Sequence, residues 1–356
     1  MEIVILAAMK IQNYLTILFI TCTCAASGQQ RPYYTQYILN NYIINPAVAG
    51  IENYWDVKAS HRHQWVGLDG APVTTYITIQ GPLSKNDMDD RENPTSFHPE
   101  GENPRGHVFM ENYKSTDPHH GAGLTVLNDR TGPINRFALY GTYAYHLPLN
   151  DRVSMSGGVS LGIQDVSLKT SELDFGAAYP VDPVVAGSAY INNIRPDISL
   201  GLMFYSAQWF AGLAVQQIIP SKIGFNDGKL GGDSVTLING KLVPHTFLQF
   251  GYRVLLGEDL SLLPSITAKY INPLPLSFDI NMKLQYRDLM WVGVSARPDD
   301  GFAAMVGINI NSMINIGYSY DYTTSLLNTV SNGTHEIVVG FLLGNKYGDW
   351  CPRNVW

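Results

Sequence analysis

One segment of the chain, residues 276–287, sorts its side chains almost completely by parity. Even positions carry large apolar residues: Leu276, Phe278, Ile280, Met282, Leu284 and Tyr286. Odd positions carry polar or charged residues: Ser277, Asp279, Asn281, Lys283, Gln285 and Arg287. Successive side chains of a β-strand point to opposite faces of its sheet, so this alternation predicts a strand with one apolar and one polar face. A wall with lipid on one side and water on the other needs such a strand.

The same alternation recurs along most of the chain and defines about fourteen predicted strands. They are residues 55–65, 73–83, 119–128, 135–147, 152–166, 196–206, 209–219, 244–256, 259–271, 275–287, 289–297, 301–311, 313–322 and 334–343. No linker divides them, and 15% charged residues with 33 Gly and 21 Tyr are unusual for a soluble enzyme. An even number of strands brings both chain ends to the same side, as in bacterial outer-membrane barrels. The predicted fold is therefore all-β, a transmembrane antiparallel β-barrel over residues 55–344.

The first 28 residues have the pattern of an export signal. Lys10 supplies a charge, residues 15–20 are apolar, and residues 25–28 form a small-residue cleavage zone. The apolar core is short for a bilayer-spanning helix, which favours a cleaved signal peptide over an anchor, with Met1 or Met9 as alternative starts. Cleavage would leave one cysteine, Cys351, in the tail 345–356. Since no later window is apolar enough for a membrane-spanning helix, a membrane protein of this sequence must be a barrel, located in the outer membrane.

The connections between the predicted strands alternate in length. Those after even-numbered strands are mostly tight, such as residues 148–151 and 207–208, and long ones, such as 167–195 and 220–243, follow odd-numbered strands. Outer-membrane barrels have short periplasmic turns and longer external loops, so the alternation supports the barrel and assigns its two ends. Residues 84–118 break the rule, because this long, charged connection follows the second strand. We expect either a periplasmic segment that meets a partner or a mobile solvated loop.

Residues 29–54 precede the first predicted strand and are too apolar for a free tail. Their apolar side chains are Tyr37, Ile38, Leu39, Tyr42, Ile43 and Ile44. Pro46 lacks a backbone donor and biases Asn45 toward extended geometry, and Gly50 permits a reversal of the chain. We expect an ordered, irregular segment that either plugs the barrel lumen or contacts another subunit. The predicted lumen-lining residues, on the polar face of the strand described first, are Asp279, Asn281, Lys283, Gln285 and Arg287.

Features that resemble catalytic or metal sites have simpler explanations. Residues 158–162 match the G-x-S-x-G pattern of a nucleophile elbow, but they lie within a predicted strand and no helix follows. His61 and His63 share a strand face, where they could bind a metal, yet no third ligand is identifiable. The acidic residues of 87–92 lack the Gly turn and distant Glu of a calcium loop. The sequence therefore predicts no catalytic residue, no metal and no cofactor.

A family resemblance is carried by three blocks near the start of the chain. They are Gln-Tyr-x-x-Asn at residues 36–40, Ile-Asn-Pro-Ala-x-Ala-Gly at 44–50, and Gln-Trp-Val-Gly-x-Asp-Gly-Ala-Pro at 64–72. With Gly-Tyr-Ser-Tyr-Asp-Tyr at 317–322, His-Glu-Ile at 335–337 and Cys-Pro-Arg at 351–353, the chain closely resembles the PorP/SprF family of Bacteroidota outer-membrane proteins associated with type IX secretion and gliding motility. The motif residues taken from these blocks are Asn45, Pro46, Gly50, Gln64, Trp65, Gly67, Asp69 and Gly70. The third block also has the Asp-Gly and Pro chemistry of a tight hairpin, which could by itself explain its residues.

The resemblance implies a non-enzymatic outer-membrane barrel that supports export, or cell-surface anchoring, of a large secreted protein such as a gliding adhesin. It implies as partners the periplasmic, motor-linked ring of the secretion system and the secreted protein or its C-terminal sorting domain. A passive porin or a hydrophobic-ligand transporter is the main alternative, and a soluble secreted β-sandwich is a weaker one. The net charge of −7 and the scattered basic residues give no electrostatic reason to expect nucleic acid as a partner.

Overall fold

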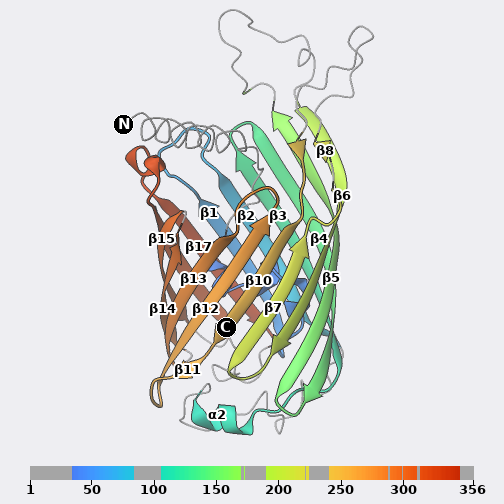
Figure 1. Ribbon diagram of the computed structural model, residues 1–356, viewed down its shortest axis with the longest axis vertical. Helices are drawn as coiled ribbons and strands as arrows, with labels where there is room; N and C mark the ends of the chain where they lie inside the picture. The colour runs from blue at the N-terminus through green and yellow to red at the C-terminus, as the bar shows by residue number, and fades with distance from the viewer. Residues whose placement is uncertain are drawn as a thin grey trace, which may run out of the picture.

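The computed structural model describes residues 34–83, 106–169, 172, 190–220, 222–223, 240–287, 289–298, 300–310 and 313–344. Their strands form a closed 14-strand antiparallel barrel (Figure 1). The wall strands are β1 (Trp55–His63), β2 (Val73–Leu83), β3 (His119–Thr131), β4 (Ile134–Asn150), β5 (Val153–Lys169), β6 (Tyr190–Tyr205), β7 (Trp209–Gln216), β10 (His245–Tyr252), β12 (Leu260–Ile271), β13 (Ser277–Tyr286), β14 (Met290–Arg297), β15 (Gly301–Asn309), β16 (Ile314–Thr323) and β17 (Thr334–Leu343). The predicted all-β fold class and barrel architecture are confirmed.

The barrel closes because its first and last strands pair with each other. β1 runs antiparallel to β17 from Trp55 opposite Leu343 to His63 opposite His335. On the far side, β10 pairs with both β7 and β12. Every wall strand therefore has two neighbours, and no edge is left to pair with another chain.

The two faces of the wall have opposite polarity, and the apolar face points outward. In β13, Ile280 and Met282 are about half exposed, whereas Asp279 and Asn281 are each 2% exposed. The same arrangement, with apolar side chains outside and polar side chains inside, holds around the barrel, where large aliphatic and aromatic side chains form an exposed outer belt. Lipid is the medium that stabilises such a surface. No helix among the described residues is long and apolar enough to span a membrane.

Several strands differ in extent from the prediction. β5 runs on to Lys169 and β6 begins at Tyr190, so the loop between them is shorter than expected. The predicted strand 244–256 is divided at Arg253 into β10 and the short β11 (Val254–Leu255). The predicted loop 220–243 contains two short strands, β8 (Lys222–Ile223) and β9 (Gly240–Lys241), which pair with each other.

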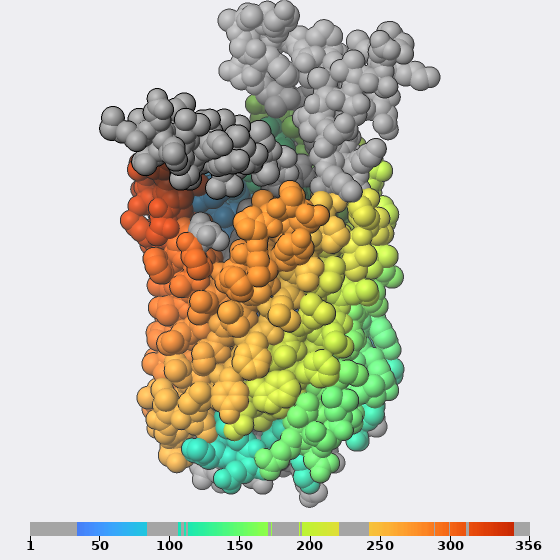
Figure 2. Space-filling view, viewed as in Figure 1, coloured from blue at the N-terminus to red at the C-terminus, as the bar shows by residue number. Residues whose placement is uncertain are grey.

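The described part of the connection after β2 packs under the end of the barrel that carries the tight turns. Residues 106–118 include α2 (His107–Asn112), seen below the strands in Figures 1 and 2. Met110 and Tyr113 form an apolar cluster with Ala207 of a tight turn, and the backbone N–H of Ser115 donates to Asp151 O at 2.8 Å. The solvated-loop alternative therefore does not describe residues 106–118. The predicted signal peptide, residues 84–105 and the tail 345–356 lie outside the described residues.

The segment that precedes β1 lies inside the barrel, where the core of the molecule is found. It forms three short 3-10 helices, η1 (Gln36–Ile38), η2 (Asn41–Ile43) and η3 (Pro46–Val48). Pro46 starts η3, and the side chain of Asn45 caps it by accepting from the backbone N–H of Ala47 at 3.0 Å. η3 contacts β4, β5 and β6, whereas η1 contacts β16 across the ring. Residues 34–54 therefore cross the lumen and are called the lumenal segment below.

Candidate functional site

The barrel wall has glycines where the lumenal segment comes closest. A Cβ on Gly158 of β5 would lie 2.5 Å from both Ala47 N and Pro46 C. A Cβ on Gly121 of β3 would lie 1.8 Å from Ala49 O. Other inward glycines that meet the segment in this way are Gly123, Gly201 and Gly317. Any side chain at these positions would collide with the segment, so wall and segment are fitted to each other.

The backbone of the segment is hydrogen-bonded to wall side chains in its middle. Ser156 Oγ donates to Ala47 O at 2.7 Å, and Gln216 Nε2 donates to Ile44 O at 2.7 Å. Gly50 N–H donates to Gln80 Oε1 at 2.8 Å. The backbone groups that the short 3-10 helices leave unpaired must find such partners when the segment is buried, because an unpaired backbone group costs about 1–3 kcal/mol.

The segment's own side chains make further bonds to the wall. Tyr42 OH donates to Thr142 Oγ1 at 2.7 Å, and Asn45 Nδ2 donates to Leu202 O at 3.1 Å. Of the predicted motif residues in this segment, Asn45 and Pro46 thus sit against β6 and β5, and Gly50 adopts a φ of 89°, where it faces Gly121. Only a glycine adopts that backbone angle without strain.

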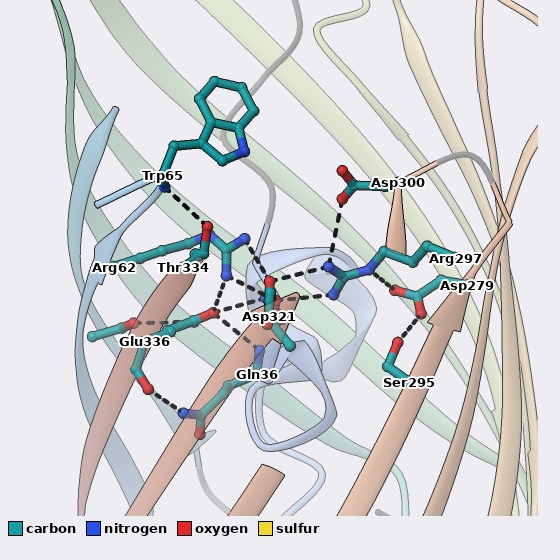
Figure 3. A network of polar contacts seen from close by, with 12 residues as sticks. Gln36, Arg62, Trp65, Asp279, Ser295, Arg297, Asp300, Asp321, Thr334 and Glu336 are labelled. Atoms are coloured by element: carbon teal, nitrogen blue, oxygen red, sulfur yellow. Dashed lines mark hydrogen bonds and ion pairs between the residues drawn. The ribbon is translucent and has the colours of Figure 1, made fainter. Parts of the chain in front are cut away.

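A buried network of charges holds the start of the segment (Figure 3). Arg62 of β1 donates to Asp321 Oδ2 at 2.8 Å and to Glu336 Oε2 at 3.1 Å. Thr35 joins them, because its backbone N–H donates to Glu336 Oε2 at 2.8 Å and its hydroxyl to Asp321 Oδ2 at 2.5 Å. Gln36 Nε2 donates to Glu336 O at 2.8 Å. The carboxylates are therefore shared between a wall cation and the segment, which fixes where the segment begins.

A second arginine, on β14, extends this network to β13 and connects it with β16. Arg297 Nη1 lies 3.1 Å from Asp321 Oδ2, and its Nε lies 3.4 Å from Asp279 Oδ2. Ser295 donates to the other Asp279 oxygen at 2.5 Å. Asp321 thus has two cationic neighbours, Arg62 and Arg297, whereas Glu336 is paired with Arg62. Removal of one partner from a buried pair of this kind is strongly destabilising, because it leaves a buried charge uncompensated.

Two histidines hold the other end of the segment, near the tight turns. His119 Nε2 lies 3.0 Å from Gly50 O, and His146 Nε2 lies 2.8 Å from Ala49 O. Their rings stack with centroids 4.5 Å apart and planes 2° from parallel. The Tyr205 hydroxyl can donate to His146 Nδ1, so His146 Nε2 carries the hydrogen that Ala49 O accepts. Both ring nitrogens of His119 face carbonyl oxygens, Gly50 O and Asp117 O. The segment is thus bound at both ends and along its length.

Small cavities lie beside the segment. One cavity, lined by Tyr34, Ile44 and Phe247, has a volume of about 40 Å³. Another, lined by Tyr42, Thr125 and Tyr140, has about 30 Å³. Each holds at most a few water molecules.

The motif residues of 64–72 form a loop at the long-loop end of the barrel rather than a tight hairpin turn. Val66 N–H donates to Gly333 O at 2.9 Å, and Gly132 N–H donates to Gly70 O at 2.9 Å, so the loop is tied to the connections on both sides. Trp65 adopts a φ of 46°, which strains a bulky residue. Gln64 N–H donates to Pro72 O, and Gly67 lies near Asn332. Asp69 and Gly70 line an open cleft of about 620 Å³ with Arg130 and Glu172.

The predicted lumen-lining residues divide into two groups. Asp279, Asn281, Lys283 and Gln285 are buried on the inner face of β13. Asn281 Nδ2 lies 2.5 Å from Tyr37 OH of the segment, and Lys283 Nζ lies 5.1 Å from the centre of the Trp291 ring. Arg287 instead lies beyond the end of β13, exposed, where Asp259 holds it at 2.9 Å and raises the pKa of its guanidinium.

Several residues of the site were given no role from the sequence, although Gln36, Asp321 and Glu336 lie in the family blocks 36–40, 317–322 and 335–337. They are Thr35, Gln36, Arg62, His119, His146, Arg297, Asp321 and Glu336. Parity places Arg62 on the polar side of β1, opposite His61 and His63, but gives no partner for it. Those two histidines lie on the outer side, where His61 Nδ1 contacts Thr75 Oγ1 at 2.9 Å. Among the described residues, no group of three or more His, Cys, Asp or Glu side chains is arranged to hold a metal ion.

Comparison with known proteins identifies the family. A family model described as "Type IX secretion system membrane protein PorP/SprF" matches residues 26–341, nearly the whole chain. The chain belongs to the PorP/SprF family. Its β-barrel is that of an outer-membrane protein, and its family associates it with type IX secretion and with the components of that system. The family and the fold are those of a non-enzymatic barrel.

Solved structures with a similar shape are outer-membrane barrels. A Pseudomonas putida toluene transporter, TodX, is 11% identical, with a TM-score of 0.45 over 87% of this chain and 94% of the other. A Pseudomonas aeruginosa FadL homologue is 12% identical, with a TM-score of 0.43 over 83% and 92%. The translocator domain of the autotransporter NalP from Neisseria meningitidis is 10% identical, with a TM-score of 0.38 over 81% and 88%. Nothing about the function of this chain follows from them, and no curated protein matches it.

Proposed function

We propose that this protein is a non-conducting, non-enzymatic partner in type IX secretion, which supports export or surface anchoring of a secreted protein such as a gliding adhesin. The observation that carries the proposal is the family match over residues 26–341. Its partners are the periplasmic, motor-linked ring proteins and the secreted protein or its C-terminal sorting domain. It acts through the two ends of the barrel and performs no catalysis.

The geometry of the lumen supports the non-conducting part of this proposal. In this proposal, the lumenal segment serves as a resident plug of the barrel rather than as a contact to another subunit. The glycines that face Ala47 and Ala49, the buried network at Thr35 and the histidines at Gly50 all favour that role. A passive porin needs a continuous aqueous passage, which the segment would obstruct.

The test is site-specific photo-crosslinking in the native membrane, with a photoreactive residue at one of three exposed positions. Lys114 lies at the tight-turn end, Asp69 at the long-loop end, and Leu248 on the lipid-facing wall as the control. We expect periplasmic secretion proteins to crosslink at Lys114, the secreted protein at Asp69, and no protein at Leu248. Failure to trap any secretion component or secreted protein at either end would contradict the proposed role.

The porin alternative is tested separately with purified protein in planar bilayers. We expect the wild-type barrel to stay closed. Steady ion conductance would refute the plug, and it would favour the porin if crosslinking also failed.

A further inference from the structure

The outer wall has a depression over four adjacent strands, β13–β16, of which the two middle strands turn small residues toward the membrane. On β14 and β15 the outward residues include Ala296 and Ala304. Their paired neighbours are large: Ala296 lies opposite Ile280 of β13 and Phe302 of β15, and Ala304 lies opposite Tyr320 of β16. Two short side chains surrounded by long ones leave a groove.

The groove has a volume of about 440 Å³ and is lined by Ile280, Met282, Val294, Phe302, Tyr320 and Tyr322, with the two alanines at its base. This volume lies within the range of about 300–1,000 Å³ that is typical of small-molecule sites. The tyrosine walls are held in place, since Asn328 Nδ2 lies 2.6 Å from Tyr322 OH and Tyr320 OH lies 3.4 Å from Asn332 O. The groove is therefore a formed site rather than a gap between mobile side chains.

The outward side chains of the groove make it suitable for one chemical class of ligand. Its walls are aliphatic and aromatic, and both tyrosine hydroxyls have partners in the loop between β16 and β17. The groove is continuous with the apolar belt that faces the bilayer, and it lies toward the end of β14 and the start of β15, beside the long-loop end. A hydrocarbon chain in the external leaflet meets both conditions, polarity and depth.

We propose that this groove on β13–β16 binds one acyl chain of an outer-leaflet lipid. Transfer of a chain from the bilayer into the groove removes no apolar surface from water, so its preference comes from packing contacts with the preformed walls. A side chain that fills the groove should therefore abolish the preference without disturbing the rest of the wall.

The experiment uses the full-length barrel in phosphatidylcholine vesicles that contain a small fraction of a phospholipid with a diazirine on its acyl chain. After irradiation, mass spectrometry locates the labelled residues. We expect residues 280–282 and 302–304 to be labelled about tenfold more than equally exposed wall residues, a ratio that corresponds to about 1.4 kcal/mol of preference.

Matched variants separate the groove from the general lipid contact. Ala304→Phe fills the groove and should reduce the labelling there to the level of the surrounding wall. Ala296→Phe fills its other part and serves as the second variant if the first does not fold. Ala211→Phe, an outward position on β7 that is separated from β13 by β10 and β12, should leave the pattern unchanged. Uniform labelling around the belt, or undiminished labelling in a folded Ala304→Phe barrel, would overturn the proposal.

Discussion

Two adjacent glycines of β5 provide a matched test of whether the lumenal segment is a fixed part of the barrel. A Cβ on Gly157 would meet nothing within 4 Å, whereas a Cβ on Gly158 would lie 2.5 Å from the backbone of the segment at Pro46 and Ala47. The two residues share a strand, and neither has a positive φ. The two alanine variants therefore differ chiefly in the face of the strand that carries the added methyl group.

The expected energies have opposite signs. Gly157→Ala should raise the free energy of unfolding by about 0.4–1 kcal/mol, because it reduces the entropy of the unfolded chain. Gly158→Ala has the same gain but forces the segment away from the wall, an overpacking cost of about 1–3 kcal/mol. The free energies of unfolding of the two variants should thus differ by about 1–3 kcal/mol.

The measurement is urea unfolding of the reconstituted barrel, followed by tryptophan fluorescence, with bilayer conductance on the same samples. We expect the lower midpoint for Gly158→Ala, and any conductance that appears should be confined to that variant. Equal unfolding free energies for the two alanines would refute the idea that the segment is packed against β5. The Gly201→Ala variant, whose Cβ would lie 2.0 Å from Asn45 Oδ1, gives an independent repeat on β6.

Three further predictions concern the polar contacts. Arg62→Met leaves Glu336 without its ion pair to Arg62 and should cost about 3–5 kcal/mol in urea unfolding. Arg297→Met breaks the buried ion pairs with Asp279 and Asp321 and should cost about as much. His146→Leu removes a donor from a buried carbonyl and should cost about 1–3 kcal/mol, whereas an exposed control, His120→Leu, should change stability by less than about 0.5 kcal/mol. Lys169 and Arg130 lower the pKa of Glu172, chiefly through the hydrogen bond from Lys169. The contribution of this carboxylate to folding stability is therefore present above its unfolded pKa of about 4.3 and is lost as the pH falls through its folded pKa. Glu172 is exposed, so solvent screens its ion pairs. We therefore expect Glu172→Gln to have the same melting temperature as the wild type at pH 7 and at pH 5. A clear difference in melting temperature at either pH would contradict this expectation.

The strands could be predicted where lipid and water lie on opposite sides of them. In β13 the alternation from Phe278 to Gln285 gave the strand and its two faces, because a single misplaced residue would expose a polar group to lipid. The prediction was wrong at the start of β6, which begins at Tyr190 rather than at Pro196. The added residues, such as Asn192 and Asn193, carry no alternation. The parity signal is expected to end where both faces of a strand meet water, above the lipid.

The contacts of the lumenal segment could not be predicted from the sequence in the same way. Parity assigns Arg62, Asp321 and Glu336 to the inner face, but Thr35 and Glu336 are 301 residues apart, and pairing over that separation depends on closure of the ring. Gly158 and Gly121 gave no usable signal either, because glycine in a strand usually weakens it and only occasionally marks the close approach of another backbone. The apolar content of residues 37–44 did give a correct expectation of burial.

The proposed plug constrains where this barrel can act in secretion. If residues 34–54 stay seated, a polypeptide cannot pass through the lumen, because the segment crosses it and contacts β4, β5 and β6 on one side and β16 on the other. Export would then take place in another component, and this chain would contribute surfaces. Two ordered surfaces are available at opposite ends: the loop 64–72, tied to its neighbours and strained at Trp65, and residues 106–118, packed under the tight turns. Substitutions that unseat the segment should therefore change conductance without loss of crosslinking at Asp69 or Lys114. A variant that conducts and also loses both crosslinks would mean that the segment shapes the two surfaces as well as filling the lumen.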